Sequence, residues 1–207
     1  MTGTELKGDL RTRAPTACLV GAVAMVALSL PVRADPAAPA FVDRAHGLPA
    51  PHVYTGGWEH FVGGGVAVFD CNDDARPDLF AAGGGSPARL FVNATPAPGA
   101  PLLFSEGALP RLTRVTGAYP LDIDGDGHLD LAVLRVGPNL LLRGDGACGF
   151  ADATAAWGFQ GGDAWSTAFS ATWEDGQTWP TLAIGNYVDL RDPEGPFGAC
   201  DTNELHR

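Results

Sequence analysis

Short apolar runs recur along the chain, each bounded by glycine or by acidic turn residues. Runs at 79–81, 131–133 and 182–184 directly follow a turn, and each has a second apolar or alternating run before that turn. Runs of this length between turn residues are typical of β-strands. The mostly apolar segments 89–92 and 139–142 predict a further strand in the first two units. Because neither heptads nor helix-length periodicity is present, we expect an all-β fold rather than an α/β enzyme.

The strand–turn–strand pattern is an internal repeat. Segments centred near 65–85, 117–135 and 169–186 align without gaps, with Asp122 lying 52 residues after Asp70 and Trp173 51 residues after Asp122. Repeats of about 50 residues are typical of propellers and solenoids. Three to four predicted strands per repeat match the content of a propeller blade. We therefore predict a partial β-propeller of about three four-stranded blades over residues 35–207.

The turn in the second repeat carries the most distinctive chemistry. Asp122, Asp124, Asp126, Gly127 and Asp130 form the pattern D-x-D-x-D-G-x-x-D. Hard cations prefer several converging oxygen ligands, and four carboxylates within nine residues would repel one another without a cation. We expect a Ca²⁺ site here, with the carbonyl of the seventh residue, His128, as a further ligand. An EF-hand loop differs because it closes with a glutamate at its twelfth position.

The first repeat has the same spacing, with Asp70, Asn72, Asp74 and Asp78 as side-chain ligands and Arg76 at the seventh position. Ala75 replaces the turn glycine and Asn72 removes one charge, so we predict a weaker calcium site. In the third repeat only Asp175 is retained. The other ligand positions hold Trp173, Gln177 and Thr181, and we expect no metal there.

Glycine-rich segments followed by D-x-[DN]-x-D-x-x-x-D resemble FG-GAP/VCBS repeats, which build the propellers of integrin α-subunits. Residues 56–67 resemble, more narrowly, bacterial secreted proteins related to cartilage acidic protein, which usually end in an ASPIC/UnbV-type domain. The resemblance covers about 41–207 and implies a calcium-binding propeller. Such propellers usually close with about seven blades. We therefore expect this chain to be a fragment, marginally stable or self-associating.

Composition narrows the class of partner. The chain has 13 basic and 24 acidic residues and a formal net charge of −11. So acidic a protein is a poor polyanion binder, which excludes nucleic acid as the main partner. The 28 glycines and 17 prolines agree with many turns between short strands. We expect the partner to be an extracellular protein or a carbohydrate, and the sequence does not specify which.

The first 34 residues have the layout of a secretory signal peptide. Lys7, Arg11 and Arg13 precede an apolar run at 16–30, and Val32 and Ala34 are small residues at the two positions that a signal peptidase reads. The run is shorter than the roughly 20 residues that cross a bilayer. We predict a signal peptide at 1–34, cleavage after Ala34, a secreted or periplasmic location, and no membrane span in the mature chain.

Export permits disulfides, and the mature chain contains Cys71, Cys148 and Cys200. Three cysteines allow at most one bridge, and spacing alone does not fix the pairing. We favour Cys148–Cys200, because Cys71 lies inside a predicted metal loop.

Candidate catalytic groups are sparse. Glu59 and His60 are adjacent, but no partner motif accompanies them, so we interpret them as exposed polar groups at a strand edge. The five histidines lack zinc-type spacing, and the Arg143-Gly144-Asp145 tripeptide is interpreted as part of a hairpin turn. We therefore predict a non-enzymatic binding or interaction scaffold with no catalytic residues. The alternative is a truncated part of a propeller enzyme acting on extracellular polysaccharide.

Overall fold

The computed structural model describes residues 40–61, 64–192 and 199–207. The repeats belong to one compact unit, Val42–Arg207. The predicted signal peptide at 1–34 lies outside the described residues. Within the described ranges, no helix has the length and apolar character needed to cross a membrane.

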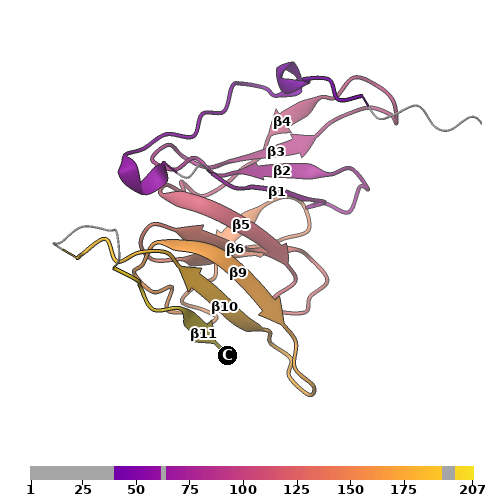
Figure 1. Cartoon of the computed structure of the whole chain (residues 1–207). Coiled ribbons are helices and arrows are strands. Elements are labelled where there is room, and N and C mark those ends of the chain that lie inside the picture. Colours follow the sequence, from indigo (N-terminus) through magenta and orange to yellow (C-terminus); the bar gives the residue numbers. More distant parts are fainter. Residues whose placement is uncertain (1–39, 62–63, 193–198) are drawn as a thin grey trace, which may run out of the picture. The chain divides into compact units, whose positions relative to one another are not determined.

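Three antiparallel sheets make up the compact unit, and they follow one another along the chain (Figure 1). The first sheet contains β1 (Val66–Phe69), β2 (Asp78–Ala81), β3 (Arg89–Asn93) and β4 (Phe104–Glu106). The second contains β5 (Val115–Leu121), β6 (Asp130–Arg135), β7 (Leu140–Gly144) and β8 (Phe150–Asp152). The third contains β9 (Ser166–Thr172), β10 (Thr181–Asn186) and β11 (Glu204–His206). The described helical elements are two short 3-10 turns, η1 (Ala45–Gly47) and η2 (Trp58–His60).

Each sheet is therefore a blade, and the predicted all-β, partial-propeller fold is confirmed, with three described strands in the third blade. Within each of the first two blades, consecutive strands pair as neighbours. The first hairpin of those blades closes directly on its acidic turn, with Phe69 opposite Asp78 and Leu121 opposite Asp130. The two acidic turns thus lie at the same end of their blades.

The middle blade is buried on both faces, which explains the uninterrupted apolar run in β6. Leu131 and Val133 pack into a cluster shared with the first blade, whereas Ala132 and Leu134 pack into a cluster shared with the third. Side chains alternate between the two faces of a strand, so a run of four apolar residues supplies both interfaces.

The first blade has one neighbouring blade in the described chain. In β1, Ala67 and Phe69 are buried, while Val66 and Val68 are 64% and 59% exposed. The preceding segment covers part of this outer face. The His52 ring lies edge-on to Phe91, with 6.1 Å between the ring centroids, and its Nε2 is 2.8 Å from the carbonyl oxygen of Ala82. Phe91 is consequently buried although it faces away from the second blade.

Glycine-rich segments join the first and second blades through backbone hydrogen bonds. The amide of Gly65 donates to the carbonyl of Thr116 at 2.9 Å, and that of Gly84 donates to Val115 at 3.2 Å. Gly84 has a φ of +60°, and a Cβ there would lie 2.3 Å from the carbonyl oxygen of Thr55. A side chain at this position would therefore push the backbone around Gly84 away from that of Thr55.

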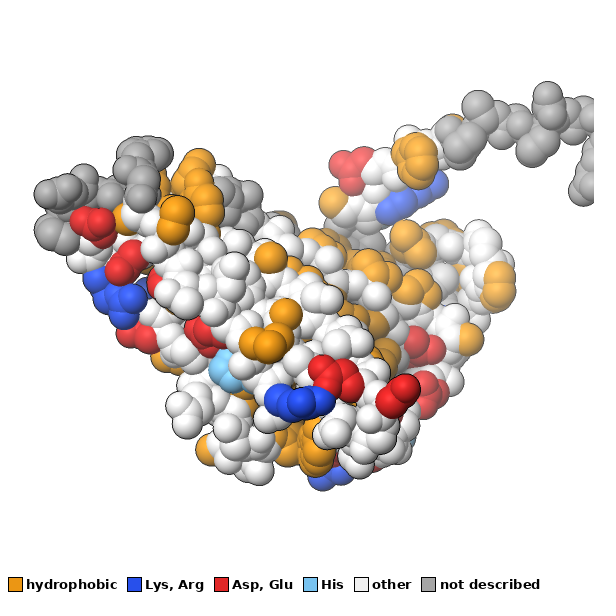
Figure 2. Space-filling view, turned by 60° about the horizontal axis from the view of Figure 1, so that its bottom comes forward, with side chains coloured by type: hydrophobic (Ala, Val, Ile, Leu, Met, Phe, Trp, Pro, Cys, Tyr) orange, Lys and Arg blue, Asp and Glu red, His pale blue; other side chains and the backbone are white. Residues whose placement is uncertain are grey.

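Charge is dispersed over the visible surface of the unit. Figure 2 shows acidic side chains distributed across the face in view, with basic side chains beside some of them. Ion pairs of the described residues include Arg89–Glu106, at 2.8 Å, and Arg191–Asp189, at 2.8 Å. On this face, the net negative charge is spread out and is not gathered into one patch.

Glu59 and His60 do not lie at a strand edge, so that interpretation was wrong. They belong to η2, where His60 is only 4% exposed and its ring centroid lies 6.0 Å from that of Tyr54. His60 Nδ1 is 3.2 Å from Glu59 Oε1. The 3-10 turn rotates the imidazole inward, a conformation that the local sequence pattern did not indicate.

Candidate metal centre in the acidic turns

The two acidic turns connect the first two strands of their blades and share one construction. The first acid of each, Asp70 or Asp122, follows the first strand, and the ninth, Asp78 or Asp130, begins the second. Both ninth-position carboxylates are fully buried. The predicted ligand positions of the two repeats therefore occupy equivalent places.

The ninth-position acid ties the turn to the third strand. Asp130 Oδ2 accepts a hydrogen bond from the amide of Ile123 at 2.8 Å, and Oδ1 accepts one from Gly144 at 2.9 Å. Burial raises the pKa of Asp130, and these two N–H groups oppose the rise. A nearby cation would favour the ionised form in the same way.

Three of the four predicted carboxylates converge in the second turn. Single carboxylate oxygens of Asp122, Asp124 and Asp130 all lie within 4.8 Å of one another. The amides of Gly125 and Gly127 donate to Asp122 at 2.8 and 3.0 Å and hold its carboxylate inside the turn. An all-oxygen set held this close suits a hard cation such as Ca²⁺.

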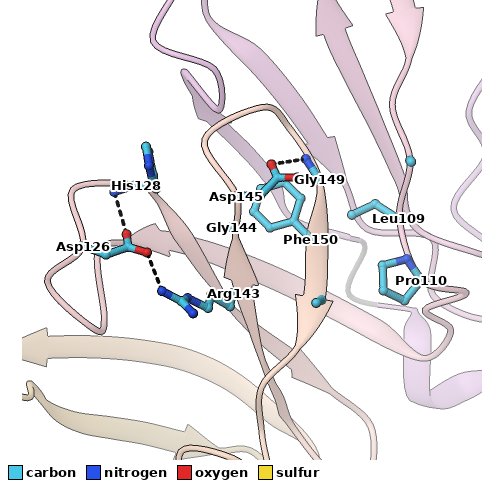
Figure 3. A pocket seen from close by; sticks show the side chains of 11 residues that line it. Leu109, Pro110, Asp126, His128, Arg143, Gly144, Asp145, Gly149 and Phe150 are labelled. Carbon is cyan, nitrogen blue, oxygen red and sulfur yellow. Dashed lines mark hydrogen bonds and ion pairs between the residues drawn. The ribbon is translucent and has the colours of Figure 1, made fainter.

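Asp126, the fourth predicted carboxylate, is bound by an arginine. Its Oδ2 accepts from Arg143 Nη2 at 2.8 Å, and its Oδ1 accepts from the amide of His128 at 2.9 Å (Figure 3). Arg143 Nε also lies 2.9 Å from Asp124 Oδ2. The His128 amide, followed by the Arg143 guanidinium, lowers the pKa of Asp126. We did not expect Arg143 at this site from the sequence.

Residues 70–133 match the family model described as the FG-GAP-like repeat. The match begins at the first acid of the first turn and ends within β6, so it spans both acidic turns. A comparison with curated proteins gave no match.

The first acidic turn is held by the same kind of contacts. Asp70 accepts hydrogen bonds from the amides of Asn72, Asp74 and Ala75, at 3.3, 3.2 and 2.7 Å. The Asp74 carboxylate contacts Arg76 Nη1 at 3.2 Å. Both turns therefore place an arginine on the acid at their fifth position.

Asn72 gives the first turn an unsatisfied acceptor. Its Oδ1 is buried and has no hydrogen-bond partner among the described residues, while its Nδ2 donates to Asp74 Oδ2 at 3.4 Å. A buried acceptor without a donor is costly and calls for a cation or an ordered water. Together with the carboxylate at Asp70, this oxygen makes the first turn compatible with Ca²⁺.

Ala75 and Gly127 occupy the same position and the same backbone region, with φ of 62° and 89°. A left-handed conformation costs a residue with a Cβ about 1 kcal/mol. We expect Ala75→Gly to stabilise the protein by up to about 1 kcal/mol, less the added entropy of the unfolded chain, and Gly127→Ala to destabilise it by about 1 kcal/mol. Urea unfolding of both variants would test this, and equal stability of all three proteins would contradict it.

The third turn has a different construction. Glu174 accepts from Thr181 Oγ1 at 3.3 Å and forms an ion pair with Arg207. Trp173, at the first ligand position, is half exposed. Asp175, the one retained acid, lies at the exposed tip of this turn.

The cysteine pairing differs from the one favoured above. Cys71 is bonded to Cys148, and Cys200 is exposed and unpaired in the structure. Cys71 is the second residue of the first turn, and Cys148 lies between β7 and β8 of the second blade. The bridge therefore joins the first and second blades. Asp78 Oδ2 is 2.9 Å from Cys71 Sγ, but a disulfide sulfur carries no hydrogen, so this contact is not a hydrogen bond.

Proposed function

We propose that the protein is a secreted, calcium-binding β-propeller repeat protein that acts as an interaction scaffold and not as an enzyme. The convergence of oxygens from Asp122, Asp124 and Asp130 carries the proposal. The equivalent first turn and its unpartnered Asn72 Oδ1 add independent support.

Calcium is the cation that this donor set favours. The second turn would bind it through Asp122, Asp124 and Asp130, with Asp126 and the carbonyl of His128 as further ligands. The first would use Asp70, Asn72, Asp74, Asp78 and the carbonyl of Arg76. Calcium accepts six to eight oxygens in flexible geometry, whereas magnesium requires a tighter octahedron. Bound calcium would neutralise the clustered carboxylates.

Export is supported by two kinds of observation. A disulfide between Cys71 and Cys148 is typical of oxidising compartments outside the cytosol. The signal-peptide layout of residues 1–34 and the resemblance of residues 56–67 to bacterial secreted proteins related to cartilage acidic protein agree with this. We propose a secreted or periplasmic location.

A scaffold role is favoured over catalysis by the position of the one candidate acid–base pair. His60 belongs to η2, and its imidazole is buried against Tyr54, where a substrate would not reach it. The acids of the two calcium turns are engaged by backbone amides that shape the turns. An extracellular protein or a carbohydrate is the proposed partner.

Isothermal titration with calcium tests the proposal. We expect two ions per chain, with dissociation constants of about 10⁻⁴–10⁻³ M. Asp124→Asn keeps the shape of the side chain but removes its charge, and we expect it to abolish one of the two sites. Binding of no calcium up to several times these concentrations would refute the proposed function.

A further inference from the structure

The second acidic turn is contacted by a cation of the protein itself, the guanidinium of Arg143. We propose that Arg143 competes with calcium for Asp124 and Asp126 and thereby sets the calcium affinity of this turn. The inference rests on the proposed calcium-binding function and concerns a residue outside the nine-residue turn.

Arg143 lies near the end of β7 and reaches two of the predicted ligands at once. Figure 3 shows its contact with Asp126. Its Nε is 2.9 Å from Asp124 Oδ2 and its Nη2 is 2.8 Å from Asp126 Oδ2. The two ligand side chains are 11% and 27% exposed, whereas that of Arg143 is 53% exposed. The guanidinium therefore covers the two carboxylates from the solvent side.

The position of Asp126 shows the consequence. Asp122, Asp124 and Asp130 form the close group of oxygens, and Asp126 is not a member of that group. Its Oδ2 accepts from Arg143 instead. Arg143 thus holds the fourth carboxylate of the motif in an ion pair.

The first blade provides an internal comparison. The amide of Asn93 donates to Asp78 as the amide of Gly144 donates to Asp130, so Val92 is the counterpart of Arg143. An apolar side chain at Val92 places no charge beside the first turn. There, the guanidinium of Arg76 contacts one acid, Asp74, at 3.2 Å. Of these two turns, only the second has a guanidinium that contacts two of the acids.

Competition predicts effects of opposite sign on stability and on binding. Without calcium, the ion pairs of Arg143 relieve repulsion among the acids, so their loss would destabilise the protein. When calcium binds, the same carboxylate oxygens are needed as ligands, and a positive charge nearby opposes a second cation. Removing Arg143 would therefore tighten calcium binding. A residue that only oriented the carboxylates would give the reverse effect on affinity.

The test is Arg143→Gln in the full chain, measured by calcium titration and by thermal unfolding with chelator. The second-turn site is the one that Asp124→Asn abolishes. We expect its dissociation constant to fall about fivefold and the melting temperature without calcium to fall as well. Arg89→Gln is the matched control, because it breaks the Arg89–Glu106 pair far from either turn, and it should leave calcium affinity unchanged.

The outcomes separate this inference from the proposed function. If the wild-type chain binds no calcium, the proposed function fails. If it binds calcium but Arg143→Gln leaves the affinity unchanged or weakens it, the competing role of Arg143 is refuted and the calcium sites remain. If Arg89→Gln tightens binding equally, the effect is one of overall charge and not of this ion pair.

Discussion

Removing calcium is expected to lower the melting temperature of the protein by roughly 6–12 °C. At about 1 mM free calcium and a dissociation constant of about 10⁻⁴ M, one site contributes roughly 1.4 kcal/mol to the free energy of unfolding. Two independent sites contribute roughly 3 kcal/mol, which is a large share of the stability of a marginal domain. Magnesium should not restore the melting temperature, because it prefers a tighter shell of six oxygens.

Equivalent positions in two blades supply the control for this experiment. Asp124 and Asp175 align in the second and third turns, but only Asp124 belongs to a group of converging oxygens. Asp124→Asn should remove about half of the calcium-dependent stabilisation, whereas Asp175→Asn should remove none. An identical melting temperature of the wild type with calcium and with chelator would contradict the prediction. So would equal loss in the two variants.

Breaking the bridge between the first two blades should have an effect at least as large. Cys71 and Cys148 are separated by 77 residues, and a cross-link that closes a loop of that length raises the free energy of the unfolded chain by about 4.5 kcal/mol. We expect the double variant Cys71→Ser, Cys148→Ser to melt about 9–18 °C below the wild type under non-reducing conditions.

Cys200→Ser is the matched control, because Cys200 is exposed and has no disulfide partner in the structure. Its melting temperature should equal that of the wild type. If Cys200→Ser were instead the destabilising change and the double variant were neutral, the chain would pair its cysteines differently in solution. Peptide mapping of the non-reduced protein would identify that pairing.

Local sequence patterns predicted the strands well, because short apolar runs between turn residues mark the buried segments of a sheet. Leu131 and Val133 lie in an apolar run directly after a turn, and that run is β6. The alternate spacing of acids between two strands likewise predicted where the turns of the first two blades would lie. The backbone of such a turn is fixed mainly by hydrogen bonds to its own first acid, as at Asp122.

Contacts between distant residues were not predictable in this way. Arg143 lies 17 residues after Asp126 and reaches it only because β7 pairs with β6. The Cys71–Cys148 bond depends on the packing of two blades, which spacing in one sequence does not encode. Aligning the sequences of β3 and β7 would have placed Arg143 at the position of Val92 and shown the additional charge in the second blade.

Locating calcium in crystals grown with millimolar calcium would test the metal assignment most directly. Anomalous scattering should reveal one ion inside the second turn, bounded by Asp122, Asp124 and Asp130, and another in the first turn beside Asp70 and Asn72 Oδ1. The third turn, around Asp175, should show none. Turns that keep the same conformation but contain only water, with Asp126 still bound to Arg143, would contradict a calcium-binding role.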